Sequence, residues 1–368
     1  MTNNSSVAHS ATASRRLPAE WENQGCILLA WPHENTDWAY ILPEARRCIA
    51  DIVRSITAGG LCVALVGPSE FCLPSIAEHN FDPSRVKFFD IPTNDTWARD
   101  FGPITVESEG RLLPLDFKFN GWGLKFAADK DNRITSRLDA LGFFNSGIEN
   151  RLNFVLEGGS IESDGEDTLL TTSECLLSPN RNGQWNRSQI AGYLRSAFGL
   201  NHILFLGHGA LIGDDTDSHI DTLARLAPHD TIIYCGPGEP DNPNHAELVK
   251  MKEELMTLRT PSDQPYNLIE LPLPDVIEMD GEILPATYAN FLITPTRILM
   301  PTYGQKRKDF LAAQTLKISF PDHEICGIDC IPLIRQHGSL HCVTMQLPEG
   351  AVKGIHDGRW DAPNLPAK

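Results

Sequence analysis

The sequence predicts an α/β fold that is built from repeated helix–strand units in one domain. Segments with apolar residues at helical spacing alternate with short apolar runs that are typical of buried strands. After a strand at residues 61–66, a helix followed by a strand recurs five times, at intervals of roughly 50 residues. The composition does not shift along the chain and no Pro/Ser-rich linker divides it, which indicates a single domain.

The elements follow in chain order. The first helix is expected over residues 43–57, where alanine and isoleucine recur on one face and Gly59 ends it. Five predicted helix–strand pairs come after the strand at 61–66: 69–78 with 86–91, 136–141 with 153–156, 187–198 with 202–206, 245–258 with 267–271, and 307–316 with 323–327. Further short strands are expected at 168–171, 230–234 and 297–300, and an exposed loop at 235–244.

Composition and charge limit the function. Hydrophobic residues make up 41% of the 368 residues, which is typical of a globular chain. The formal net charge of −17 argues against nucleic acid as a partner, because binding to phosphates relies on positive charge. Long-range attraction favours a small cationic substrate, although solubility accounts for most of the acidity.

The cysteines and the chain's first residues predict a protein of the cytoplasm. The nine cysteines lack the spacing of a disulfide framework and are expected to be free thiols in a reducing compartment. Residues 1–16 lack the apolar stretch of a signal peptide and are expected to be a loose tail before a catalytic domain at 17–368. No apolar run reaches the length of a membrane span, so no membrane partner is expected, and the oligomeric state stays open, a homo-oligomer included.

Four polar clusters occupy matching places in the repeat. They lie at residues 94–100, 156–160, 214–221 and 338–342, each next to a predicted strand. Polar groups past matching strands of a cyclic repeat are expected to point into one central cavity.

Cys342 is the candidate nucleophile of this cavity. It follows the flexible pair Gly338-Ser339 and is expected at the start of a strand over 342–345. A thiol with an ordinary pKa of ~8.5 needs a nearby cation to become a thiolate at neutral pH. The alternative is an inert core cysteine.

His219 and Asp221 are expected on one strand, where residues two apart face the same side. His219 is suited to act as general acid and then as base, and Asp221 to accept hydrogen bonds from a cation. The alternatives are an acidic loop that leads into a strand and a metal-dependent hydrolase site in 214–221. The metal site ranks lower because Cys342 has no role beside a hard cation.

Asp100 is the second candidate ligand for a guanidinium, which a carboxylate holds with two parallel hydrogen bonds. Trp97 would cover the cation or its alkyl stem. Arg99 is expected to pair with carboxylates elsewhere, the alternative being an ion pair with Asp95 or Asp100 that shapes a turn.

Two weaker predictions concern the cavity's surroundings. Glu157 precedes two glycines that allow close backbone approach, which would place its carboxylate beside a ligand; the alternative is a solvated turn. Trp122, in the aromatic segment 117–123, would line the pocket mouth.

Taken together, these motifs resemble the agmatine deiminase family, also called Porphyromonas-type peptidyl-arginine deiminases. The resemblance extends from Leu17 onward and rests on ordered motifs at 18–22 (PAEWE), 29–33 (LAWPH), 95–103 (DTWARDFGP), 119–123 (FNGWG), 156–160 (LEGGS), 179–182 (PNRN), 214–221 (DDTDSHID), 288–291 (YANF) and 338–342 (GSLHC). Ser218 departs from the family's usual Gly, and Ser339-Leu340 from the Asn-Ile of agmatine deiminases.

The resemblance implies a five-bladed α/β propeller of the pentein superfamily with a central active-site cavity. It implies Cys342 as nucleophile, His219 as acid/base, and Asp100 and Asp221 as guanidinium ligands. Trp97, Glu157, Asp217 and Trp122 are the further expected substrate contacts. The implied reaction converts agmatine to N-carbamoylputrescine and ammonia through an S-alkylthiouronium intermediate, with no metal or cofactor required.

Agmatine is favoured over arginine by charge. Arginine's carboxylate needs a cationic partner in an acidic site, and Arg99 and Arg181 are the nearest candidates. If carboxylates already hold both arginines, that partner is missing. Deimination of free or peptidyl arginine is the alternative within the enzyme class, and a non-catalytic guanidine-binding protein is the alternative outside it.

Overall fold

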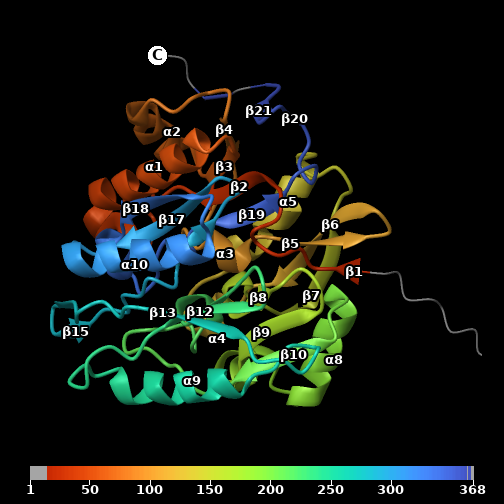
Figure 1. Cartoon of the computed structure of the whole chain (residues 1–368). Coiled ribbons are helices and arrows are strands. Elements are labelled where there is room, and N and C mark those ends of the chain that lie inside the picture. Colours follow the sequence, from red (N-terminus) through yellow and green to blue (C-terminus); the bar gives the residue numbers. More distant parts are fainter. Residues whose placement is uncertain (1–14, 363, 366–368) are drawn as a thin grey trace, which may run out of the picture.

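Helices and strands alternate along the chain, which confirms the predicted α/β fold (Figure 1). The structure is a computed structural model and describes residues 15–362 and 364–365. Most of the expected tail, residues 1–14, lies outside these limits. Arg15 and Arg16, which were expected to belong to the tail, form β1 (Arg15–Arg16) and pair antiparallel with β5 (Ile104–Ser108).

The strands repeat one pattern. Residues 15–362 contain five sheets of three or four strands, and each has an antiparallel pair followed by a parallel neighbour. The sheets, in order, are β19 (Met345–Pro348), β2 (Gln24–Ala30), β3 (Cys62–Gly67) and β4 (Val86–Asp90); β1, β5, β6 (Arg111–Lys118) and β7 (Glu149–Val155); β8 (Ile161–Ser163), β9 (Thr168–Thr172) and β10 (His202–Leu206); β11 (Ala224–Ala227), β12 (Thr231–Cys235) and β13 (Asn267–Leu271); and β16 (Leu292–Ile293), β17 (Arg297–Thr302) and β18 (Glu324–Asp329).

The repeat does not amount to a closed barrel. Within the described residues, strand pairing does not join the five sheets into one continuous sheet. Two small hairpins, β14 (Glu278–Met279) with β15 (Glu282–Ile283) and β20 (Ile355–His356) with β21 (Arg359–Trp360), stand apart from them. The five-bladed propeller therefore stays a prediction.

Helices cover the outside of the sheets (Figure 1). The longer ones are α1 (Leu42–Ala58), α2 (Ser69–Ile76), α5 (Ile134–Ala140), α8 (Arg187–Phe198), α9 (His245–Thr257) and α10 (Lys306–Ser319). Helix α10 packs on β13, β17 and β18, and α1 on β3, β17 and β18. No helix in the described part of the chain has both the length and the apolar character that a membrane crossing needs.

Local sequence sets the limits of these helices. In α8, Asn186 accepts a hydrogen bond from the backbone of Gln189, whose side chain bonds back to the Asn186 backbone. Gly199 ends α8 in the left-handed conformation, with φ 74°. In α1, the face that carries Ile49 and Ile52 is buried against the sheets.

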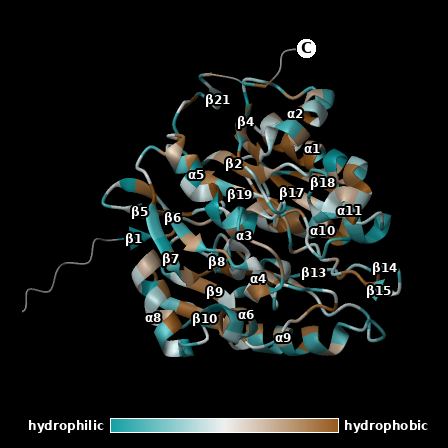
Figure 2. Ribbon diagram, turned by 180° about the vertical axis from the view of Figure 1, so that it is seen from behind, coloured by the Kyte–Doolittle hydropathy of each residue, from teal (hydrophilic) through white to brown (hydrophobic). Residues whose placement is uncertain are grey.

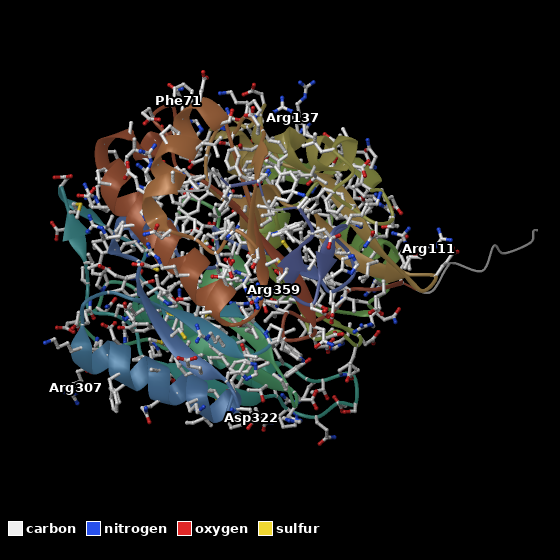
Figure 3. The ribbon with its side chains drawn as sticks, turned by 90° about the horizontal axis from the view of Figure 1, so that it is seen from above. Phe71, Arg111, Arg137, Arg307, Asp322 and Arg359 are labelled. Carbon is white, nitrogen blue, oxygen red and sulfur yellow. The ribbon has the colours of Figure 1, made fainter. Side chains whose placement is uncertain are left out.

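The apolar faces of these elements form one core. Figure 2 shows the hydrophobic residues turned inward and the hydrophilic ones on the outer helix faces. Seen from above, charged side chains such as Arg111, Arg307 and Asp322 project outward (Figure 3).

Two local predictions were wrong. His219 and Asp221 do not lie on a strand; they lie at and within the 3₁₀ turn η5 (Ile220–Thr222). The reason is local: Asp217 and Ser218 both have φ of 63°, which no strand tolerates, and the Asp214 carboxylate accepts the Ser218 backbone N–H at 2.7 Å. Cys342 likewise lies in a turn before β19, where the Thr344 backbone N–H bonds the His341 carbonyl.

Replacing Ile52 by alanine on the buried face of α1 is expected to lower the free energy of unfolding by about 2–5 kcal/mol, because the lost methyl groups leave a cavity. Urea unfolding followed by circular dichroism measures the change. The exposed Arg47 on the same helix is the matched control, and Arg47→Ala should change that free energy by less than about 0.5 kcal/mol. Equal losses in the two variants would contradict the packing of α1.

Candidate active site

The polar residues singled out in the sequence come from turns between the five sheets. Asp100 lies in α3 (Ala98–Phe101) after β4, His219 and Asp221 lie between β10 and β11, and Cys342 precedes β19. A pocket of about 170 Å³ exposes Cys342 and Asp100 between the rings of Trp97 and Trp122. Two of the four expected catalytic residues, Cys342 and Asp100, therefore line this pocket, and the other two lie directly behind them: Asp221 Oδ2 is 3.8 Å from Cys342 Sγ, and His219 Nδ1 is 3.6 Å from Asp100 Oδ1.

Cys342 lies at the floor of the pocket. Asn290 donates its side-chain N–H to Cys342 Sγ at 3.2 Å, and Asp221 Oδ2 lies 3.8 Å from the sulfur. Burial, Asp221 and Asp100 together raise the pKa of the Cys342 thiol well above its ordinary value. The thiol therefore stays protonated until a cation offsets the two carboxylates.

Asp221 has one engaged and one unengaged oxygen. Its Oδ2 lies 2.7 Å from His341 Nδ1, while its buried Oδ1 has no hydrogen-bond partner among the described residues. Burial opposes ionisation, but the charge of His341 and its hydrogen bond lower the pKa of Asp221 below its ordinary value. Asp221 is thus an ionised acceptor with room for a donor.

Asp100 is held by two donors from neighbouring loops. Trp122 Nε1 donates to Oδ2 at 2.9 Å and the Gly159 backbone N–H donates to Oδ1 at 3.1 Å. Burial raises the pKa of Asp100 to about 6, against the opposing charge of His219. The indole of Trp122 is therefore an anchor for Asp100 as well as a wall of the pocket.

His219 is buried beside Asp100. Its Nδ1 lies 3.6 Å from Asp100 Oδ1, and neither ring nitrogen has a hydrogen-bond partner in the described part of the chain. Burial disfavours the charged ring, yet the neighbouring Asp100 and Cys175 raise the pKa of His219 to about 10. His219 therefore carries a proton at neutral pH and is suited to act as an acid.

Two glycines allow this close arrangement. A Cβ atom at Gly159 would lie 2.7 Å from His219 Nδ1 and 2.8 Å from Asp100 Oδ1. A Cβ atom at Gly338 would lie 2.2 Å from the Trp97 ring. Any side chain at either position would push the site apart.

Glu157 and Asp217 were expected to contact the substrate, but the structure pairs both with Arg181. Arg181 Nε lies 2.9 Å from Glu157 Oε1, and its Nη1 lies 2.5 Å from Asp217 Oδ2. Neither carboxylate is among the pocket-lining residues of the described chain. Arg99 donates to Gln346 Oε1 at 2.6 Å and lies 3.5 Å from the Glu20 carboxylate. Its carboxylate partner is therefore neither Asp95 nor Asp100, which agrees with the prediction that Arg99 pairs elsewhere.

The mouth of the pocket is acidic. Asp37, Asp95 and Asp215 line it together with Phe126 and His337, and no lysine or arginine of the described residues does so. Burial raises the pKa of Asp95 to about 6, although the indole of Trp38 donates a hydrogen bond to it at 2.8 Å.

A partly exposed ion pair lies next to the pocket-lining residues Phe126 and Thr216. Lys125, just after α4 (Gly121–Leu124), contacts Asp217 Oδ1 at 2.6 Å and the Asp215 carbonyl at 2.5 Å. The loop that carries Trp122 is thereby tied to the loop that carries the acidic segment 214–221.

Within the described residues, two sets of side chains have donor atoms close enough to one another to hold one metal ion. They are Glu157, Cys175 and His219, and Glu20, Glu162 and His341. Guanidinium groups already neutralise the carboxylates of both sets: Arg181 in the first, Arg225 and Arg99 in the second. A metal cation would have to compete with these buried positive charges.

The acidic segment 214–221 does not converge on one point. Asp214 bonds the Thr216 hydroxyl and the Ser218 backbone, Asp217 bonds Arg181 and Lys125, and Asp221 bonds His341.

Three residues of the site received no role from the sequence. Asn290 contacts Cys342, and its Oδ1 accepts the His341 backbone N–H at 2.9 Å. The His341 ring bonds Asp221 through one nitrogen and Glu20 through the other. Each sits inside a motif of the family resemblance (288–291, 338–342 and 18–22), which was the available signal.

A model of the Porphyromonas-type peptidyl-arginine deiminase family matches residues 16–348. The chain belongs to this family. A "Putative agmatine deiminase" of Vibrio parahaemolyticus is 31% identical over 361 residues, covering 90% of this chain and 96% of the relative.

Solved structures of deiminases have the same fold. The "Putative Arginine Deiminase" of Porphyromonas gingivalis is 46% identical with a TM-score of 0.84, covering 92% of this chain and 100% of that one. A cysteine-to-serine variant of C. jejuni agmatine deiminase with substrate bound is 37% identical with a TM-score of 0.84, covering 92% and 97%.

One departure from the family's usual sequence has a visible compensation. Ser218, at a position where the resemblance leads us to expect glycine, adopts a φ of 63° that favours glycine. Its hydroxyl donates to Glu174 Oε2 at 2.9 Å, which helps to hold this conformation.

His219 is expected to remain protonated well above neutral pH, because Asp100 stabilises the charged ring. Ring ¹⁵N shifts of histidine-labelled protein, followed by NMR from about pH 6 to about pH 11, measure its pKa. Asp100→Asn should lower that pKa by at least about one unit, since it removes a negative neighbour. The exposed Asp129 supplies the control, and Asp129→Asn should leave it unchanged. Titration of His219 near its ordinary value in the parent protein would contradict this electrostatic picture.

Proposed function

We propose that the protein hydrolyses agmatine to N-carbamoylputrescine and ammonia with Cys342 as nucleophile. The observation that carries the proposal is the placement of a buried thiol between two carboxylates, Asp100 and Asp221, at the floor of a pocket with an acidic mouth. This arrangement suits a planar cation that reacts with sulfur.

The guanidinium would bind between Asp100 and Asp221 through charge-assisted hydrogen bonds. The unengaged Oδ1 of Asp221 supports this placement. Because these two carboxylates raise the pKa of Cys342, a cation between them lowers it, and the substrate itself would promote thiolate formation, with the thiol proton passing to solvent water.

The Cys342 thiolate would then attack the guanidinium carbon and form a C–S bond. His219 would give its proton to the departing nitrogen, so that ammonia leaves and an S-alkylthiouronium remains. Neutral His219 would next take a proton from a water molecule that attacks the same carbon. The C–S bond breaks, and the ureido product and the Cys342 thiolate are released.

Charge supports agmatine over arginine. Arg99 and Arg181, the two candidate partners for an α-carboxylate, are both held by carboxylates. The mouth offers Asp37, Asp95 and Asp215, which would attract the terminal ammonium of agmatine and repel the carboxylate of arginine.

Two alternatives to agmatine hydrolysis can be tested: another substrate, and binding without turnover. The similar protein of Porphyromonas gingivalis bears the name of an arginine deiminase, so free or peptidyl arginine is the second candidate substrate. A binding protein without turnover is opposed by Cys342 and Asp100 in the pocket with Asp221 and His219 in contact behind them.

Two further proposals concern the arrangement of the sheets around the site and the compartment of the protein. We propose that the five sheets surround the site as the blades of a propeller, because the turns between successive sheets supply its residues. We also propose a reducing compartment such as the cytoplasm, which agrees with nine free cysteines.

Cys342→Ser is expected to lower kcat by at least about a thousandfold, because the hydroxyl is a far poorer nucleophile and no neighbour replaces the sulfur. Ammonia release from agmatine measures turnover, and circular dichroism checks folding. Cys326→Ser, at a half-buried cysteine on β18, is the matched control and should retain parental activity. Activity of Cys342→Ser within about tenfold of the parent would exclude Cys342 as the nucleophile.

Agmatine is expected to exceed free arginine and arginyl peptides in kcat/KM by at least about a hundredfold, because an unpaired carboxylate in an acidic pocket is strongly disfavoured. Steady-state ammonia release on the three substrates decides between them. Higher efficiency with arginine or a peptide would overturn the agmatine assignment and leave guanidine hydrolysis standing.

The contribution of the mouth can be isolated with butylguanidine, which has the guanidinium but no terminal ammonium. Asp215→Asn should lower kcat/KM for agmatine more than for butylguanidine. Equal losses would show that Asp215 does not attract the substrate's tail.

A further inference from the structure

A buried chain of charged side chains runs from Asp221 away from the substrate pocket. Asp221 Oδ2 lies 2.7 Å from His341 Nδ1, and His341 Nε2 lies 2.6 Å from Glu20 Oε2. All three side chains are at least nine-tenths buried. The imidazole of His341 is thus clamped between two carboxylates.

This geometry favours a charged His341. A neutral imidazole has one N–H and can donate to only one of the two carboxylates. Carboxylates lie at both nitrogens, so only an imidazolium can donate to each of them; Arg225 Nη2, 3.1 Å from Nε2, is a further neighbour of that nitrogen. The fold thus places a site for a cation beside Asp221.

We propose that His341 and Glu20 are positioning residues that keep Asp221 ionised and oriented for the guanidinium. His341 engages Oδ2, which leaves Oδ1 as the oxygen without a hydrogen-bond partner among the described residues and so as the acceptor available to a guanidinium. Glu20 stabilises the imidazolium from the other side. The inference rests on the proposed function, because it assigns these residues to the binding of the guanidinium.

The charges around this chain balance. Arg225 of β11 lies 3.1 Å from His341 Nε2 and pairs with both Glu20 and Glu162 of β8. Arg99 of α3 lies 3.5 Å from Glu20. The carboxylates of Asp221, Glu20 and Glu162 are thus accompanied by three basic groups, those of His341, Arg225 and Arg99. The other groups that face Asp221 are Cys342, His219 and Asp100.

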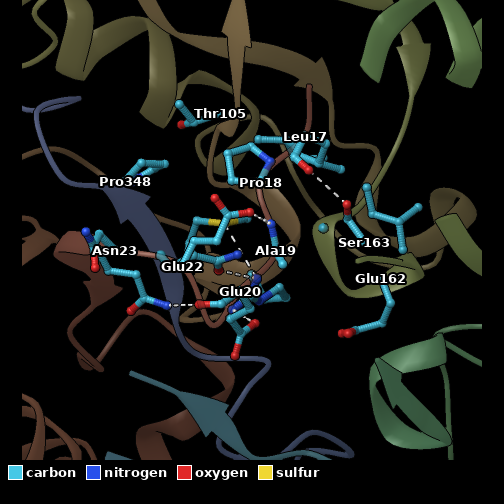
Figure 4. A pocket seen from close by; sticks show the side chains of 17 residues that line it. Leu17, Pro18, Ala19, Glu20, Glu22, Asn23, Thr105, Glu162, Ser163 and Pro348 are labelled. Atoms are coloured by element: carbon cyan, nitrogen blue, oxygen red, sulfur yellow. Dashed lines mark hydrogen bonds and ion pairs between the residues drawn. The ribbon is translucent and has the colours of Figure 1, made fainter. Parts of the chain in front are cut away.

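Glu20 itself is remote from the substrate. It lines a second pocket, of about 60 Å³, with Glu162 and Ser163 (Figure 4). This pocket shares no lining residue with the pocket at Cys342. A change at Glu20 therefore tests the chain without altering the substrate's contacts.

Both ends of the chain predict a defect at low pH. In His341→Gln, Asp221 loses the cation that holds its pKa low, so its protonation moves to higher pH and substrate binding fails on the acid side. In Glu20→Gln, the His341 ring loses one of the two carboxylates that hold it against Asp221, so the same acid-side defect is expected at a smaller size.

The experiment measures kcat and KM for agmatine from about pH 5 to about pH 10 in the parent and both variants. We expect His341→Gln to lose at least about tenfold more kcat/KM at pH 5.5 than at pH 8, mostly through KM. We expect Glu20→Gln to show the same acid-side loss at a smaller size and to keep the parental profile at alkaline pH.

Controls separate this role from a purely structural one. His323→Gln, at a half-buried histidine outside the chain, should keep the parental pH profile, and thermal unfolding checks all variants. Equal losses at every pH in both variants, with KM unchanged, would overturn the proposal. If His341→Gln does not fold, the acid-side loss of Glu20→Gln alone decides it.

Failure of the proposed function would look different. In that case the parent protein releases no ammonia from agmatine, arginine or arginyl peptides. If the parent turns over arginine instead, the same pH series with arginine tests the chain.

Discussion

Buried charge is the constraint on which the rest of the site depends. Ionised carboxylates in a protein interior are unfavourable unless cations or hydrogen-bond donors offset them. Each carboxylate of the site has such a partner: Trp122 and Gly159 for Asp100, His341 for Asp221. Among the described residues of the site, the Oδ1 of Asp221 and the ring of His219 have no hydrogen-bond partner, and substrate and ammonia would be handled there.

The fold meets this constraint by bringing turns together. Each sheet ends in a short irregular segment, and residues of these segments reach the same buried space although they lie far apart in the sequence. Left-handed backbone at Asp217 and Ser218, and the glycines at 159 and 338, let these turns approach more closely than regular strands would.

Sequence patterns predicted the regular elements well. Helix α8 and strands β10 and β13 begin and end at the predicted residues, because strong periodicity, a capping pair and a terminal glycine mark them. They also identified Cys342, His219, Asp100 and Asp221 as neighbours. They placed His219 and Asp221 on a strand, since alternation alone does not reveal the side-chain bonds of Asp214 that bend the backbone.

The partners of charged residues were harder to predict. Glu157 and Asp217 resemble substrate ligands in sequence, and only the position of Arg181 shows that they are occupied. Asn290 and Glu20 act through contacts more than 50 residues away in the chain, at 3.2 Å to Cys342 and 2.6 Å to His341, which no local pattern encodes.

The Lys125 bridge beside the pocket differs from the buried pairs in one respect. Its ammonium group and the Asp217 carboxylate are both partly exposed, so dissolved salt screens their attraction, whereas it hardly reaches the buried pair of Arg181 and Glu157. Ionic strength therefore acts on the outer pair: as salt rises, the tie between the Trp122 loop and the acidic loop weakens while the buried pairs stay in place. The link between these two loops and the geometry of the chemistry are held by separate forces.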